Sequence, residues 1–267
     1  MKAPAQNYIE QNKAAWNNRL DHHVQSDFYD MAAFRNGKNS LKSIELALLG
    51  EVSGKSILHL QCHFGQDSLS LARMGAKVTG ADLSDKAIQK AREINEELGL
   101  DAKFICCDLY DLPKHLDGQF DFVFTSYGTI GWLPDMDKWA AIVARYLKPG
   151  GQLIFADFHP VVWMFDDNFD FIEYRYFKSE PIVDTQTGTY ADRSAPIEIV
   201  DISWNHSMSE VITSLLGQGL RLVDLQEYDY SPYDCFQGMN KVAEDKFTIQ
   251  KMGDKLPLVY SMVVQKD

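Results

Sequence analysis

The sequence lacks any long uninterrupted apolar run. Its strongest apolar stretch, Leu153 to Ala156, stops at Asp157, well short of the roughly 20 residues that a helix needs to cross a bilayer. We therefore expect no membrane-spanning segment and no membrane partner. Residues 1–13 also lack an apolar block, so we expect no secretory leader and a cytoplasmic protein.

Basic residues are scarce as well. The 267 residues include 26 Lys and Arg against 38 Asp and Glu, a formal net charge of −12. Binding to a nucleic-acid backbone depends on Lys and Arg contacts to phosphate. The chain has no basic tract and no Asn/Asp-Pro-Pro-Tyr motif of the kind that binds a flipped base. These absences predict that nucleic acid is not a partner.

Cysteine is limited to four positions: Cys62, Cys106, Cys107 and Cys235. None of them form the C-x-x-C pairs of a zinc site, so we predict no metal centre. Buried free thiols are the expected state, which favours a reducing compartment. What the chain does have is 45% hydrophobic and 12% aromatic residues, enough apolar surface to fill one large core and to exclude disorder.

From residue 56 onward, apolar strand-like runs alternate with helical patterns. Strands are expected at 56–60, 77–81, 103–107, 120–125 and 152–158, and helices at 67–74, 84–98 and 139–147. Such alternation predicts a parallel sheet covered by helices on both faces. Two more strands follow at 220–228 and 256–265, after a helix at 209–217, and the last strand is expected to run antiparallel. The predicted fold is a doubly wound, seven-stranded, mostly parallel α/β sheet.

Residues 1–50 are expected to form a helical arm outside this sheet. Trp16, Leu20, Val24 and Phe28 recur at steps of four and predict the apolar face of a helix, with Arg19 on its polar face. A second short helix is expected at 41–49. Two interpretations of the arm stay open: a lid that brings Trp16 and Arg19 inward over a ligand, or a static arm.

Residues 51–267 are expected to form the main domain, with an inserted cap at 159–205. The alternation of strands and helices is lost between Asp157 and Trp204, where ten aromatic residues occur against about six expected from the 12% average. That composition favours an ordered segment over a flexible linker. Because ligands of open α/β sheets bind at the carboxyl edge of the strands, the cap is a candidate wall of a substrate pocket.

The turn after the first strand departs from a dinucleotide site. Such a site has three glycines, which let the backbone approach a pyrophosphate at the helix N-terminus. Here only Gly65 remains, while Gln61 and His63 occupy the two earlier positions. Side chains at both positions would crowd a pyrophosphate. The turn therefore argues against NAD but permits an adenosine-type cofactor without phosphates.

The motifs taken together resemble those of class I S-adenosylmethionine-dependent methyltransferases. They comprise His59 to Gly65, Asp82, Asp108, Phe120-Asp121 and Leu147 to Gly151. The resemblance covers about residues 50–160 and, more loosely, the final two strands. It is strongest to the small-molecule branch that includes the ubiquinone and menaquinone biosynthesis type, and within it to a bacterial subgroup of unnamed substrate. That family usually has an acidic residue and glycines where this chain has His59, Gln61 and His63.

The resemblance implies a Rossmann-like fold and S-adenosylmethionine as cofactor. Asp82 matches the acid that accepts hydrogen bonds from the two ribose hydroxyls, with Leu83 beside the adenine. Asp108 matches the acid that accepts from the adenine amino group, with the backbone of Leu109 facing the ring. Contacts along the methionine part are expected from Gln61, His63, Gly65 and Ser126. Both acids also suit the simpler interpretation of helix caps or turn residues.

The implied reaction is in-line displacement of the methyl group by a small-molecule acceptor. Tyr127 and His159 are the candidate catalytic residues, because they follow the fourth and fifth strands at the expected pocket edge. A neutral His159 imidazole would serve as a base near pH 7, although a histidine before a proline is often a turn residue. Trp132 and His206 are candidate substrate contacts, and a capping or core histidine is the alternative for His206.

The sequence also permits two further functions. One is a non-catalytic S-adenosylmethionine-binding protein, with the pocket kept and the chemistry lost. The other is an NAD(P) oxidoreductase on a Rossmann-like sheet, against which the missing glycines weigh. The assembly is expected to be a monomer or a homodimer.

Overall fold

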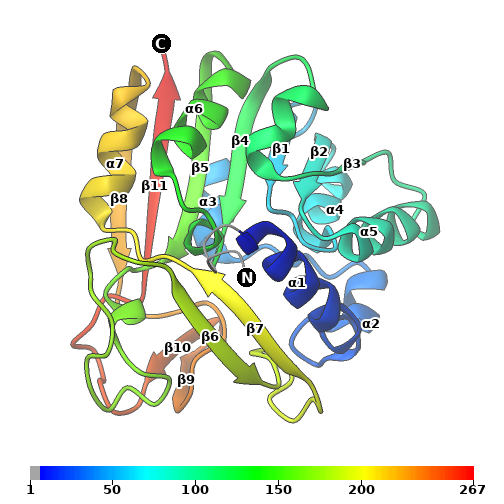
Figure 1. Ribbon diagram of the computed structural model, residues 1–267. Helices are drawn as coiled ribbons and strands as arrows, with labels where there is room; N and C mark the ends of the chain where they lie inside the picture. Colours follow the sequence, from blue (N-terminus) through cyan, green and yellow to red (C-terminus); the bar gives the residue numbers. More distant parts are fainter. Residues whose placement is uncertain (1–6) are drawn as a thin grey trace.

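The protein is built around one seven-stranded sheet, seen in a computed structural model that describes residues 7–267 (Figure 1). Residues 1–6 of the expected arm lie outside this range. The strands of the sheet, in spatial order, are β3 (Lys103–Cys106), β2 (Lys77–Asp82), β1 (Ser56–Leu60), β4 (Phe120–Ser126), β5 (Leu147–Phe158), β11 (Val259–Lys266) and β8 (Leu220–Tyr228).

The direction of the strands confirms the predicted fold class. β1, β2, β3, β4 and β5 pair in parallel. β11 inserts between β5 and β8 and runs antiparallel to both, with Met262 opposite Phe155 on one side and Leu225 on the other. The order reverses next to β1, so β1 and β4 mark the switch point at which such sheets bind ligands.

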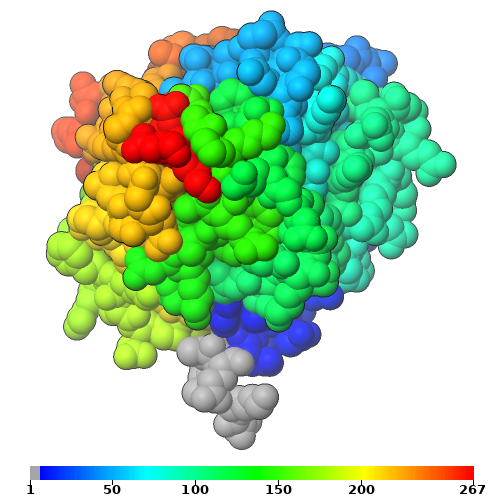
Figure 2. Space-filling view, turned by 90° about the horizontal axis from the view of Figure 1, so that it is seen from above, coloured from blue at the N-terminus to red at the C-terminus, as the bar shows by residue number. Residues whose placement is uncertain are grey.

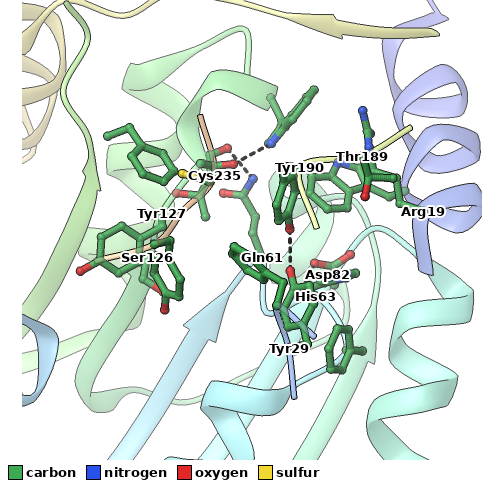
Figure 3. Close-up of a pocket in the computed structure, with 18 of the residues that line it drawn as sticks. Arg19, Tyr29, Gln61, His63, Asp82, Ser126, Tyr127, Thr189, Tyr190 and Cys235 are labelled. Atoms are coloured by element: carbon green, nitrogen blue, oxygen red, sulfur yellow. Dashed lines mark hydrogen bonds between the residues drawn. The ribbon is translucent and has the colours of Figure 1, made fainter. Parts of the chain in front are cut away.

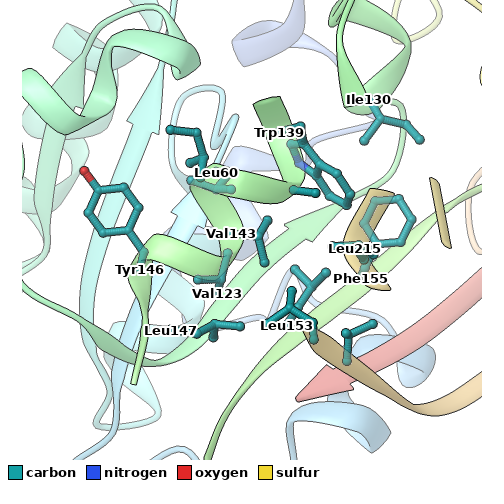
Figure 4. Close-up of a cluster of buried hydrophobic side chains, with 14 of the residues drawn as sticks. Leu60, Val123, Ile130, Trp139, Val143, Tyr146, Leu147, Leu153, Phe155 and Leu215 are labelled. Carbon is teal, nitrogen blue, oxygen red and sulfur yellow. The ribbon is translucent and has the colours of Figure 1, made fainter. Parts of the chain in front are cut away.

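Helices cover both faces of this sheet. They are α2 (Met31–Arg35), α3 (Ser43–Leu49), α4 (Gln66–Arg73), α5 (Asp85–Glu97), α6 (Met136–Tyr146) and α7 (Met208–Gly217), with 3-10 turns at η2 (Leu109–Lys114), η3 (Ile130–Trp132) and η4 (Val162–Met164). Alternate strand residues enter opposite cores. Val123 and Phe155 pack with Trp139 of α6 and Leu215 of α7 (Figure 4), whereas Phe124 packs on the α4–α5 side. Burial on both faces explains the nearly continuous apolar strands.

Helix α5 shows how the sequence sets an element boundary. Ser84 has an extended backbone and its side chain accepts from the Ala87 N–H, as predicted for an N-cap. Leu98 follows the last helical residue, and Gly99 then adopts φ +62°, the left-handed stop that glycine favours.

The long helix α1 (Tyr8–Gln25) lies across the carboxyl edge of the sheet and docks on the cap strand β7 (Glu198–Ser203) (Figure 1). The Asn12 side chain pairs with both backbone groups of Ile202, at 2.8 Å each, and so extends the edge of β7. Arg19 forms a buried ion pair with Asp201. The prediction that Arg19 lies on the polar face of α1 in contact with solvent is therefore wrong. Arg19 is only 3% exposed, because Asp201 compensates its charge.

The cap and the segment before β11 contain two small hairpins. In the cap, β6 (Ile182–Thr187) pairs with β7 in antiparallel register. Between β8 and β11, β9 (Met239–Ala243) pairs with β10 (Lys246–Ile249), a hairpin absent from the predicted elements. Residues 233–237, just before β9, reach the cavity described below.

The opposite edge of the sheet is closed by the C-terminal residues. Viewed from that side, they lie between the α7–β8 segment and the green residues near 145 (Figure 2). Lys266 donates to the Ala144 carbonyl, and Arg221 donates to Gln265. Within residues 7–267, no helix combines the length and apolarity required to traverse a bilayer.

Candidate active site

A cavity of about 620 Å³ lies at the carboxyl edge of the sheet. Its walls come from α1, the turn after β1, the ends of β2, β3, β4 and β5, the cap, and residues 233–237 (Figure 3). Every residue expected to contact the cofactor is on its wall. These are Gln61, His63, Gly65, Asp82, Leu83, Asp108, Leu109 and Ser126.

The turn after β1 keeps a glycine-like backbone without the glycines. Gln61, His63 and Gly65 have φ of +54°, +50° and +79°. Left-handed backbone is disfavoured for residues with a Cβ atom, so Gln61 and His63 are locally strained. At Gly65 a Cβ would also lie 2.7 Å from the Phe104 ring, which requires glycine there. The turn therefore keeps a backbone of the kind that glycine favours while carrying two polar side chains.

The two polar side chains of this turn are held by neighbouring elements. Gln61 Nε2 donates to the Thr129 carbonyl at 2.8 Å. His63 Nε2 lies 2.9 Å from His23 Nδ1 on α1. Burial lowers the pKa of His63 to about 3 and that of His23 to about 2, so both rings are neutral near pH 7. One ring therefore donates to the other.

Asp82 and Asp108 stand at the ends of neighbouring strands, β2 and β3. The Asp82 carboxylate accepts from the backbone N–H groups of His63 and Ser84, each at 2.8 Å. Asp108 accepts from the Tyr110 N–H at 3.0 Å and caps η2. Burial raises the pKa of both carboxyl groups. Each acid is thus a turn or cap residue and also a cavity residue, so the two interpretations from the sequence are compatible.

Trp132 and Tyr127 also line the cavity, as expected. Trp132 donates through Nε1 to the Gly128 carbonyl at 2.7 Å and meets Trp16 of α1 edge to face. Tyr127 follows β4 with φ +44°. Its hydroxyl donates to Glu45 Oε2 at 2.8 Å. Trp16 and Arg19 line the cavity too, and the lid interpretation of the arm stays a prediction beside that of a static arm.

The tyrosine and Glu45 form a buried acid–hydroxyl pair. Glu45, on α3, has 0% exposure, and burial with the nearby Asp67 raises its pKa to about 7. Burial and the Glu45 charge raise the pKa of Tyr127 well above 10. Aromatic wall residues lie nearby: Phe158 and Tyr233 contact the Tyr127 ring, and Trp163 and Phe236 contact Phe158. The pair can therefore accept a proton from a cavity ligand through the tyrosine oxygen.

The structure places His159 and His206 off the cavity wall. Within residues 7–267, neither side chain lines the cavity. His159 Nδ1 accepts from the Val161 N–H, and its Nε2 lies 2.9 Å from Glu227. His206 is bonded to the Leu133 carbonyl and lies 3.1 Å from Glu210. The interpretations of His159 as a base and of His206 as a substrate contact are therefore corrected: both rings are structural, in a turn and near a helix start.

Three residues of this region are absent from the set that the sequence predicts: Glu45, which accepts from Tyr127, and the wall residues Tyr190 and Tyr233. Glu45 was passed over inside the apolar pattern of 41–49, although a charged residue on a buried helix stripe is a signal for function. Tyr190 and Tyr233 lie in segments with no periodic pattern. Tyr190 bonds the Tyr29 hydroxyl at 2.5 Å across 161 residues of sequence, a pairing that only the fold reveals.

Comparisons with known proteins agree with this geometry. A family model described as "Methyltransferase domain" matches residues 57–151. A protein named ubiquinone biosynthesis O-methyltransferase, from Coxiella burnetii, is 29% identical over 195 residues, 72% of this chain and 74% of that protein. One of the same name from Bordetella pertussis is 34% identical over 107 residues, 40% of this chain and 44% of that one.

Solved structures share the fold. An S-adenosylmethionine-dependent methyltransferase from Mesorhizobium loti superimposes with a TM-score of 0.56 at 19% identity, covering 83% of this chain and 95% of that one. A structure described as the DhpI-SAH complex gives 0.56 at 18% identity and covers 98% of each chain. At these identities the likeness establishes the architecture.

Proposed function

Because the chain is a class I S-adenosylmethionine-dependent methyltransferase, which transfers a methyl group to a small-molecule acceptor, we propose that the acceptor group is a hydroxyl. The observation that carries this proposal is the hydrogen bond from Tyr127, which lines the cavity, to the buried carboxyl of Glu45. A hydroxyl must lose a proton when it is methylated, and this pair can take that proton. The relatives named O-methyltransferases support the same choice.

The cofactor fits the residues that the cavity presents. The Asp82 carboxylate keeps lone pairs free for a ribose diol beyond its two backbone hydrogen bonds. We assign Asp108, which follows the neighbouring strand and lines the cavity, to the adenine amino group, with Leu83 and Leu109 beside the ring. When bound, S-adenosylmethionine supplies a methyl group on a positively charged sulfur, which keeps the bonding electrons as a neutral thioether.

The chain's own residues then position the acceptor and move one proton. The acceptor hydroxyl donates its hydrogen bond to Tyr127 Oη, whose own proton is held by Glu45. As the oxygen–carbon bond forms, the acceptor proton passes to Tyr127 and the tyrosine proton passes to Glu45. Charge balances, because the sulfonium charge and the carboxylate charge disappear together. The aromatic wall excludes water and favours a ring-bearing or apolar acceptor.

The alternatives of an NAD(P) oxidoreductase and of a non-catalytic binding protein are set aside, since the matched family and relatives are methyltransferases. Free cysteines at all four positions support a reducing compartment such as the cytoplasm. The expected assembly, a monomer or a homodimer, stays a prediction.

The test is a labelled-methyl assay on matched phenol, aliphatic alcohol, aniline and thiol acceptors, read by mass spectrometry. We expect product on a hydroxyl, with a rate that rises with pH through about 7 as Glu45 ionises. Tyr127→Phe should lower the rate about 100-fold or more, the usual scale of a lost acid–base group. Cofactor affinity in that variant should stay within about two-fold of wild type.

Glu45→Gln should remove the pH dependence near 7 together with most of the rate. Glu97→Gln, which alters an exposed carboxyl on α5, is the control. Methylation confined to nitrogen or sulfur acceptors would contradict the hydroxyl proposal. So would a pH profile that stays the same in Glu45→Gln.

A further inference from the structure

Asp157 is a buried acid that the proposed reaction does not use. It is the penultimate residue of β5 and is 2% exposed. Among residues 7–267 it is not one of those that line the cavity. Burying a carboxylate costs free energy unless hydrogen bonds compensate the loss of water. The partners of Asp157 therefore indicate which part of the structure it serves.

The carboxylate binds the backbone of the loop that follows β4. Its Oδ1 accepts from the N–H groups of Gly128 and Phe158. Its Oδ2 accepts from the Thr129 hydroxyl at 3.2 Å, and from the N–H groups of Thr129 and Ile130 at 3.3 and 3.5 Å. Consecutive backbone N–H groups that converge on one anion form the concave arrangement called a nest. Both oxygens of Asp157 act as acceptors, so an amide at this position would satisfy only one side of the nest.

Tyr127 enters this loop in a backbone conformation that its own side chain disfavours. Tyr127 and Gly128 have φ of +44° and +72°. A residue with a Cβ atom keeps a left-handed backbone only where the surrounding contacts hold it there. The Tyr127 N–H donates to the Ala156 carbonyl at 2.7 Å, and the next N–H, that of Gly128, donates to Asp157. The place at which the Tyr127 side chain leaves the sheet therefore depends on the end of β5.

The carbonyl groups of the same loop are held from the opposite side. The Thr129 carbonyl accepts from Gln61 Nε2 at 2.8 Å, and the Gly128 carbonyl accepts from Trp132 Nε1 at 2.7 Å. Gln61 and Tyr127 reach the cavity from the ends of the neighbouring strands β1 and β4 (Figure 3). These carbonyl contacts do not involve Asp157, so a change at Asp157 should act on the N–H side of the loop, where Tyr127 lies.

We propose that Asp157 is a positioning residue for methyl transfer. By binding the N–H groups of residues 128–130 it sets the place of Tyr127 Oη relative to the acceptor hydroxyl. This inference rests on the proposed function, in which Tyr127 Oη takes the acceptor proton. Displacing a reacting group by about 1 Å can lower a rate on the order of 100-fold. Because Asp157 is not on the cavity wall, it acts through Tyr127.

The experiment is a double-mutant cycle on kcat, with the full chain, S-adenosylmethionine and a phenol as acceptor. Asp157→Asn keeps the size of the side chain but replaces one accepting oxygen with an NH2 group that faces backbone N–H groups. It should lower kcat about 30-fold, while KM for the phenol changes less than about three-fold. In the Tyr127→Phe background the same substitution should lower kcat less than about two-fold, because the oxygen that Asp157 positions is already absent.

Asp121→Asn is the matched control. Asp121 accepts from the N–H and the hydroxyl of Ser56, each at 2.7 Å, at the opposite edge of the sheet. Its loss should lower the thermal midpoint of unfolding and leave kcat of the folded enzyme within about two-fold of wild type.

A second pair of variants tests the same network if Asp157→Asn does not fold. Thr129→Val lacks the hydroxyl that donates to Asp157 and should lower kcat about five-fold, whereas Thr129→Ser retains it and should stay within about two-fold of wild type. Circular dichroism of each variant verifies the fold before its rate is compared.

Equal losses of kcat in Asp157→Asn with and without the Tyr127 hydroxyl would mean a structural role and overturn the proposal. A change confined to KM, or equal rates in Thr129→Val and Thr129→Ser, would overturn it too. An unchanged rate in Tyr127→Phe alone would instead contradict the proposed function on which this inference rests.

Discussion

At the scale of single residues, Glu45 is a carboxyl group with no exposure to solvent. Its carboxyl is buried beside Asp67, and its partners are the Tyr127 hydroxyl and the Lys42 N–H. Burial disfavours the charged form, so the folded-state pKa of about 7 lies above the ordinary 4.5. The group is therefore poised to gain and lose a proton in the neutral range, as a proton acceptor must.

This shift predicts a pH dependence of stability. Because the folded state binds the proton more tightly than the unfolded state, the contribution of Glu45 is fully present below pH about 4.5 and is lost as pH rises through about 7. The expected loss relative to Glu45→Gln is about 3 kcal/mol across that window. Urea unfolding of both proteins between pH 4.5 and 8.5 measures it. Parallel stability curves for the two proteins would refute the shift.

The sequence predicts which residues reach the carboxyl edge of the sheet where a residue follows a strand, and their roles stay predictions. Asp82 and Asp108 end β2 and β3, and any parallel sheet brings such ends to one edge. His159 followed the same rule at the end of β5, but its ring turns to Glu227 and the Val161 N–H. The place of a residue after a strand predicts that it lies at the carboxyl edge of the sheet. The direction of its side chain depends on neighbours such as Glu227, which is 68 residues away in the chain.

At the scale of elements, the docking of α1 on β7 depends on a buried ion pair. Arg19 and Asp201 are each about 4% exposed in their side chains. Removing one partner leaves the other as an uncompensated buried charge, so Asp201→Ala should destabilise the protein by about 3–5 kcal/mol. Denaturant unfolding measures this loss.

The control for this prediction is Glu97→Ala, which breaks the exposed Arg35 pair and should cost less than about 1 kcal/mol. The double variant Arg19→Met/Asp201→Leu should recover much of the lost stability, since neither charge then remains buried. Equal effects of Asp201→Ala and Glu97→Ala would show that the buried pair does not hold the arm.

Elements with strong local signals could be predicted, and those held by distant contacts could not. Helix α5 carries its own cap at Ser84 and its own stop at Gly99, so its limits follow from sequence. The first strand of the β9–β10 hairpin has two adjacent polar residues, Asn240 and Lys241, between Met239 and Val242, and therefore no alternating pattern. Arg19 was assigned to solvent because its counter-charge Asp201 is 182 residues away.

At the scale of the whole molecule, three separate parts of the chain come together at the carboxyl edge of the sheet. The arm supplies Arg19, the sheet supplies Asp82 and Tyr127, and the cap supplies Tyr190. A ligand that contacts all of them binds only the folded chain. At a free concentration of about 100 times its Kd it should stabilise the fold by about 2.7 kcal/mol. The net charge of −12 contributes little to ligand binding, because charges more than about 10 Å away are screened.

The most direct test of the account is calorimetric titration of the full chain with S-adenosylmethionine, in wild type and in Asp82→Ala. We expect one saturable site per chain in wild type. Affinity should fall about 10- to 100-fold in the variant, because two charge-assisted hydrogen bonds to the ribose are lost. Absence of heat in wild type up to about millimolar ligand, or equal affinities in the two proteins, would contradict the assignment of this cavity as the cofactor site.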